Sequence, residues 1–187
     1  MTKIALILSP GFADWEYAFI AGAGGPFYGL DVGFFTPQPG KLTSQGGLEC
    51  EVKRGIEDLM SWDPSVVAVI GGTVWETSAA PNLDALLKHQ RNRGAAIAGI
   101  CGGTLAQARA GLLDEIPHTS NTAEFLQTAT SYQGNARYVE SAVAVEANGI
   151  VTASGTAPAS FAAEVFRLAG VEQGAVQQFR QMMASEH

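Results

Sequence analysis

A cysteine set among glycines is the strongest sign of chemistry in this chain. The run Gly99-Ile-Cys-Gly-Gly103 has the G-x-C-x-G spacing of a nucleophile elbow, in which small neighbours allow a sharp turn that projects the central side chain. A helix that begins just after the turn would direct its N-terminal amides at the sulfur and lower the pKa of the thiol. We therefore expect Cys101 to be a catalytic nucleophile. The alternative is a buried structural cysteine beside a closely packed helix.

Two further glycines follow another apolar run. Gly71 and Gly72 come directly after residues 66–70, and Gly102 comes directly after the cysteine. Their backbone N–H groups could bind the negatively charged oxygen that forms when a thiolate attacks a carbonyl group. We predict an oxyanion hole at Gly72 and Gly102 with Gly71 beside it, although a Gly-Gly pair is also typical of a plain tight turn. Trp75 is a candidate pocket wall or a core residue.

One carboxylate and one histidine are candidates for proton transfer. Glu16, near the start of a predicted helix, could turn toward Cys101, where burial would raise the pKa of its carboxyl group and let it donate a hydrogen bond to the thiolate. The alternative is an ordinary acidic residue in the first helical turn, where the nearby Asp14 fits well. Among the histidines, His118 is the candidate catalytic partner. A surface position in its loop is the alternative.

The elements that must position these residues alternate along the chain. Apolar runs at 4–8, 31–36, 66–70 and 95–100 predict buried strands, and helical patterns occupy 15–29, 83–90 and 104–110. Residues 41–53 indicate a hairpin or excursion. A second hairpin is predicted from 141–145 and 150–153 around Asn148-Gly149, before terminal helices near 159–168 and 172–183. The pattern predicts a doubly wound α/β fold with a mainly parallel sheet and an antiparallel accessory hairpin. Such folds bind ligands at the carboxyl ends of their strands.

Composition narrows the classes of protein and partner. A chain of 187 residues with 47% hydrophobic side chains can bury one large core, so we expect residues 1–187 to form a single domain. The net charge of −7 and the scattered Lys and Arg residues argue against nucleic acid. No apolar segment is long enough to span a membrane, and residues 1–10 are typical of a strand rather than a signal peptide. Two cysteines form no disulfide framework or metal-ligand cluster. We expect a cytoplasmic protein with no metal and no cofactor.

The sequence resembles the ThiJ/PfpI (DJ-one) family of the class I glutamine amidotransferase-like superfamily. The resemblance covers almost the whole chain and rests on residues 98–103, the Gly71-Gly72 turn, Glu16 and the stretch 155–158. It implies a flavodoxin-like sandwich, a homodimer or larger assembly, and a cysteine on a strained elbow that accepts a hydrogen bond from Glu16. By position, His118 matches the histidine that many members of the family hold near the nucleophile.

Two departures from the family pattern narrow the activity. Gly102 stands where the intracellular-protease branch has a histidine, and the chain lacks the late His-x-Glu pair of true glutamine amidotransferases. One remaining function is a cofactor-free cysteine enzyme acting on a small electrophile, either amidase- or hydrolase-like or glyoxalase- or deglycase-like on 2-oxoaldehydes. The other is a redox-sensing or stress-protective protein in which Cys101 is oxidised without turnover.

A glycine-rich helical segment is the expected contact of the homodimer. Residues 18–25 contain three glycines, each of which weakens a helix by about 1 kcal/mol relative to alanine. Close approach of a second copy would explain why they are there. The alternative is that they only bend the helix against the sheet.

Overall fold

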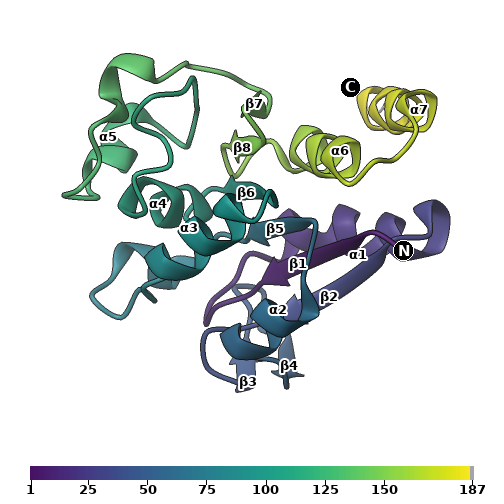
Figure 1. The fold of residues 1–187 in the computed structure, drawn as a ribbon, viewed down its shortest axis with the longest axis horizontal. Coiled ribbons are helices and arrows are strands. Elements are labelled where there is room, and N and C mark those ends of the chain that lie inside the picture. Colours follow the sequence, from purple (N-terminus) through teal and green to yellow (C-terminus); the bar gives the residue numbers. More distant parts are fainter. Residues whose placement is uncertain (186–187) are drawn as a thin grey trace.

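A mainly parallel six-stranded sheet forms the centre of residues 1–185, the part of the chain that the computed structural model describes (Figure 1). The strand order is β2-β1-β5-β6-β8-β7, in which the first five strands are parallel and β7 is antiparallel to β8. In that order the strands span Asp31–Phe35, Lys3–Ile7, Val66–Val69, Ala96–Ile100, Ile150–Ala153 and Val145–Ala147. A separate antiparallel pair is formed by β3 (Gly40–Thr43) and β4 (Glu49–Val52). The predicted α/β fold is confirmed.

Helices cover both faces of the sheet. One face packs against α1 and α6, with α7 beyond α6, and the opposite face packs against α2, α3 and α4, with α5 beyond α4 (Figure 1). The helices span Asp14–Tyr28 (α1), Ile56–Trp62 (α2), Asp84–Asn92 (α3), Gly103–Arg109 (α4), Ala123–Gln127 (α5), Pro158–Leu168 (α6) and Gln173–Ala184 (α7). Because both faces are covered, every residue of β5 and β6 is buried, as their continuous apolar sequences predicted.

Several short elements differ from the sequence-based expectation. The helices α2 and α5 and the 3-10 turns η1 (Thr73–Glu76) and η2 (Gly134–Arg137) were not predicted. Each has seven residues or fewer, which is too short for a helical apolar pattern to emerge. The strand expected at 141–145 begins only at Val145. Its hairpin with β8 turns at Asn148-Gly149 as predicted, with φ values of 51° and 74°.

The glycines of α1 have different surroundings. Gly24 packs tightly inward, because a Cβ there would lie 2.8 Å from Val32 Cγ2 and 3.6 Å from the Phe166 ring. Gly22 faces open space, with no atom within 4 Å of the same position. Internal packing therefore explains Gly24 but not Gly22.

No helix within residues 1–185 is long and apolar enough to cross a membrane.

We predict opposite effects of alanine at these two glycines. Gly22→Ala should raise the free energy of unfolding of the monomer by about 1 kcal/mol, because it removes the backbone entropy cost of a helical glycine that is exposed in the single chain, without a clash. Gly24→Ala should lower it, because the added methyl group collides with Val32. Urea denaturation of both variants measures this. Shifts of the same sign would contradict the assigned packing of α1.

Candidate active site

Cys101 lies on a strained turn directly after β6. Its φ of 51° is in the left-handed region, which costs a residue other than glycine about 1–3 kcal/mol. The turn is held by hydrogen bonds on both sides. The Cys101 N–H donates to Ala153 O at 2.9 Å, and the Cys101 carbonyl accepts from the Thr104 amide at 3.1 Å and the Thr104 hydroxyl at 2.6 Å. The nucleophile elbow predicted from the glycine spacing is present.

The neighbouring glycines permit close packing around this turn. A Cβ at Gly71 would lie 2.8 Å from Cys101 Cβ and 2.5 Å from Glu16 Oε2. A Cβ at Gly102 would lie 2.6 Å from the Trp75 ring. Side chains at these positions would displace the turn itself. Glycine is therefore needed here for space, in addition to any role of its amides.

Glu16 is buried beside the sulfur. Its side chain, from the first turn of α1, is 0% exposed, and its Oε2 accepts a hydrogen bond from the Gly71 N–H at 2.7 Å. Its Oε1 has no hydrogen-bonding partner among the described residues, and a Cβ at Gly155 would lie 3.2 Å from both Oε1 and the Cys101 Sγ. Burial raises the pKa of Glu16 to about 7, against the opposing effects of the Gly71 amide and the Cys101 thiol.

The lowered pKa expected for the Cys101 thiol is wrong. Burial, followed by the charge of Glu16, raises the pKa of the Cys101 thiol to about 11, whereas the α4 N-terminus was expected to lower it. Hydrogen bonds from Asn121 and the Gly102 amide act in the opposite direction. The two acids therefore share one proton across the neutral range, and a thiolate forms when that proton is on Glu16.

Asn121 holds the position beside the sulfur, and sequence reasoning did not assign it a role. Its Nδ2 donates to Cys101 Sγ at 3.3 Å, and its Oδ1 accepts from the Gly155 N–H at 3.0 Å. The indole N–H of Trp15, which is 48% exposed, donates to Gly155 O at 2.9 Å. Gly155 is thus held from both sides against the sulfur. One signal in the sequence pointed to the loop at Gly155, because this residue lies in the family-like stretch 155–158.

His118 makes its contacts elsewhere. It is fully buried, its Nδ1 donates to Ile116 O at 2.8 Å, and its Nε2 accepts from the Tyr132 hydroxyl at 2.7 Å. Burial lowers the pKa of His118, so the neutral ring is favoured. With both ring nitrogens occupied, the proton-transfer role expected for His118 has no support from these contacts.

Trp75 is a core residue, so its expected role as a pocket wall is wrong. It is 0% exposed, packs against Gly102 and donates its indole N–H to Ile70 O at 3.0 Å.

The two predicted oxyanion donors, the amides of Gly72 and Gly102, have different surroundings. The Gly102 amide hydrogen-bonds to Cys101. The bridge between Phe12 and Gly72 uses the amides of the residues that follow them, not that of Gly72. Their joint action on a substrate oxygen stays a prediction.

The donor set of this site is one thiol and one carboxyl group. Within residues 1–185, no group of three or more His, Cys, Asp or Glu side chains is placed to hold a metal ion. A carboxyl group that titrates near neutral pH, next to a sulfur nucleophile, is suited to acid–base chemistry on a group attached to that sulfur.

Comparison with known proteins gives consistent matches. Residues 2–168 match the DJ-1/PfpI family. The chain is 28% identical over 173 residues to the "Uncharacterized protease YoaZ" of Bacillus subtilis (strain 168), covering 88% of this chain and 82% of that protein. Among solved structures, the DJ-1 superfamily protein Atu0886 from Agrobacterium tumefaciens has a TM-score of 0.94 and 34% identity over the full length of both chains. A thiJ/pfpI family protein from Bacillus anthracis has a TM-score of 0.80 and 28% identity, covering 92% of this chain and 84% of that one.

The shared proton predicts a characteristic pH profile for alkylation of Cys101. As pH rises through about 7, the pair loses its first proton and the fraction carrying the thiolate rises to a plateau. A second rise follows near 11, when the remaining proton is lost. Iodoacetamide labelling at each pH, followed by peptide mapping, separates Cys101 from Cys50.

Replacement of the carboxyl group provides the control. Glu16→Gln removes the charge that opposes thiolate formation, so we expect one titration at a pH below 11 and no step near 7. A wild-type profile with a single rise near 11 would place the proton on sulfur throughout and contradict the thiolate role.

Proposed function

The chain belongs to the DJ-1/PfpI family, and on that premise we propose that it is a cysteine-nucleophile enzyme acting on a small carbonyl compound, either an amide or a 2-oxoaldehyde. The observation that carries the proposal is the pairing of Cys101 on its elbow with the buried carboxyl group of Glu16. A structural cysteine requires neither the strained turn nor a neighbouring buried acid. The strained backbone of Cys101 and the raised pKa of the adjacent Glu16 favour a catalytic role over a structural one.

The first chemical step is common to both substrate classes. The Cys101 sulfur attacks the carbonyl carbon, an S–C bond forms, and the π electrons of the carbonyl group move to its oxygen. The Gly102 amide, with that of Gly72 as predicted, would stabilise the resulting oxyanion. Glu16 holds the proton that the thiol gave up and lies close enough to return it.

The later steps differ between the classes. With an amide, Glu16 gives its proton to the leaving nitrogen, the C–N bond breaks, and water then hydrolyses the thioester with Glu16 as the base. With a 2-oxoaldehyde, Glu16 moves a proton from the carbon bound to sulfur to the adjacent carbon through an enediol. Water then hydrolyses the thioester to a 2-hydroxy acid. Each route restores the thiol and uses one water molecule.

The surroundings of the sulfur favour small substrates. Cys101 is half-buried, and the loop at Gly155, held by Asn121 and Trp15, packs against it. The relatives from Bacillus subtilis are named uncharacterized proteases. For this chain, the packing of Gly155 against the sulfur and Gly102 in place of a histidine support a small amide or aldehyde instead.

Oxidation sensing is the second candidate function. The N–H donors that face the sulfur, from Asn121 and Gly102, would also stabilise the oxygens of a sulfenic or sulfinic acid. In that reaction a peroxide is reduced to water or an alcohol, and the sulfur gains one oxygen for each peroxide consumed. Protein that is oxidised stoichiometrically at Cys101 but turns over no carbonyl substrate would favour this function.

We predict turnover of methylglyoxal or of simple primary amides that depends on both paired residues. Cys101→Ser should abolish turnover, and Glu16→Gln should reduce kcat by roughly 10²–10⁴-fold, the usual contribution of a positioned acid–base group. Gly155→Ala should also reduce kcat, because its methyl group would contact Sγ and Oε1 at 3.2 Å. Cys50→Ser is the matched control and should be unaffected. Turnover that survives in Cys101→Ser would refute the proposal.

We also propose a homodimer through the exposed face of α1. The exposed residues Trp15, Ala18, Gly22 and Gly25 follow one another at helical spacing, and residues 17–30 contain no charge. Gly22→Glu should convert a dimer into a monomer in sedimentation, whereas Ala79→Glu, in an exposed loop, should not. A wild-type monomer at about 50 μM, where a standard-size interface would be occupied, would contradict this.

A further inference from the structure

An apolar groove of about 600 Å³ lies next to the site. It is bounded by α1, the start of α6, the end of α7 and the segment that leads into β7. Apolar side chains supply most of its lining, among them Phe19, Val143, Pro158 and Met183. Its volume is within the range of sites that bind small molecules. No residue of the proposed catalytic pair lines it.

Two segments of the chain lead from the catalytic site to the groove. Gly155 packs against the Cys101 sulfur, and the next residue, Thr156, lines the groove. On α1, Trp15 donates to Gly155 O, and Phe19, one helical turn later on the same side of the helix, lines the groove. Gly155 and the indole ring of Trp15 therefore lie between the Cys101 sulfur and the groove residues Thr156 and Phe19.

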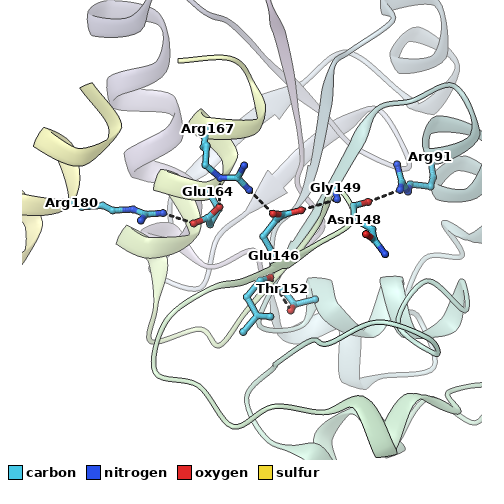
Figure 2. A network of polar contacts seen from close by, with 9 residues as sticks. Arg91, Glu146, Asn148, Gly149, Thr152, Glu164, Arg167 and Arg180 are labelled. Carbon is cyan, nitrogen blue, oxygen red and sulfur yellow. Dashed lines mark hydrogen bonds and ion pairs between the residues drawn. The ribbon is translucent and has the colours of Figure 1, made fainter. Parts of the chain in front are cut away.

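The charged residues of the groove are already paired. Among the described residues that line it, Glu164 and Arg180 alone carry charge, and they bind each other. Figure 2 shows that Glu164 also binds Arg167, at 2.8 Å, and that Arg167 in turn binds Glu146 at 2.6 Å. A charged ligand group would have to compete with this network. The groove therefore suits an uncharged apolar group.

We propose that this groove binds the uncharged, apolar end of a substrate whose carbonyl group is attacked by Cys101. The inference rests on the proposed function and narrows its substrate class to amides or 2-oxoaldehydes that carry an alkyl or aryl group. Burial of the group in the groove provides affinity, while Gly155 and Trp15 set the spacing between that group and the reacting carbon.

Chain-length dependence tests the proposal. Across alkyl 2-oxoaldehydes and primary amides from methyl to octyl, kcat/KM should rise by roughly threefold to fourfold per methylene, as expected for a buried CH2 group, until the groove is full. Ala142→Phe should flatten the series, because this exposed residue lines the groove. Ala79→Phe, outside the groove, is the matched control. Met183→Ala should shift the optimum to longer chains. A flat wild-type series would overturn the proposal.

A binding measurement separates this inference from the proposed function. Cys101→Ser protein should bind the uncharged fluorophore 1-aminoanthracene, octanamide should displace it, and Ala142→Phe should weaken binding at least tenfold. Dye binding without turnover of any compound would refute the proposed function, whereas turnover without chain-length dependence would refute the role of the groove. Dye binding that appears only after dilution to monomer would show that a second copy covers the groove and would also overturn the inference.

Discussion

A carboxyl group buried against a thiol is the constraint on which the rest of this structure depends. Because Glu16 is fully buried and Cys101 is half-buried, ionising both groups would place two poorly solvated negative charges together, so the pair retains a proton at neutral pH. The groups around the pair are consistent with this requirement. The amides of Gly71 and Gly102 and the side chain of Asn121 donate to it, and the glycines at 71 and 155 leave room for the two side chains to approach. In the proposed function, the same arrangement would supply a nucleophile and an acid without a histidine.

The position of the pair follows from the topology. Neighbouring parallel strands β1, β5, β6 and β8 end at one edge of the sheet, and each is followed by one part of the site. The first turn of α1 provides Glu16, the end of β5 leads to Gly71, β6 leads to Cys101, and β8 leads to Gly155. Strands buried on both faces hold these ends rigidly. A strained turn is tolerated there because hydrogen bonds from the adjacent strand and helix fix it on both sides.

Sequence reasoning predicted the parts of this structure that depend on local pattern. Continuous apolar runs indicated the central strands, Asn148-Gly149 indicated the hairpin, and glycine spacing indicated the elbow. It failed where contacts with distant parts of the chain determine the role of a residue. His118 and Asn121 lie three residues apart in one loop, and pairing of that loop with Tyr138 and Val139 turns the histidine toward Tyr132 while the asparagine reaches the sulfur. Similarly, Trp75 is core because Gly102 leaves space for its ring, and the acidity of Cys101 depends on its own burial and on the charge of Glu16. None of these contacts has a local signature.

The parts of the site are far apart in the chain, from Glu16 to Gly155, and this separation has a consequence for folding. No single hairpin or helix contains both the thiol and its acid, so a partly folded chain does not assemble the pair. Parallel strands make mostly long-range contacts, which form late and slowly compared with local ones. Local opening of the loop at Asn121 or Gly155 would also dismantle the surroundings of the sulfur while leaving the sheet intact. The reactivity of Cys101 thus reports whether the native state is complete. A chain that is misfolded or locally open at this site would lack the paired thiol and carboxyl group.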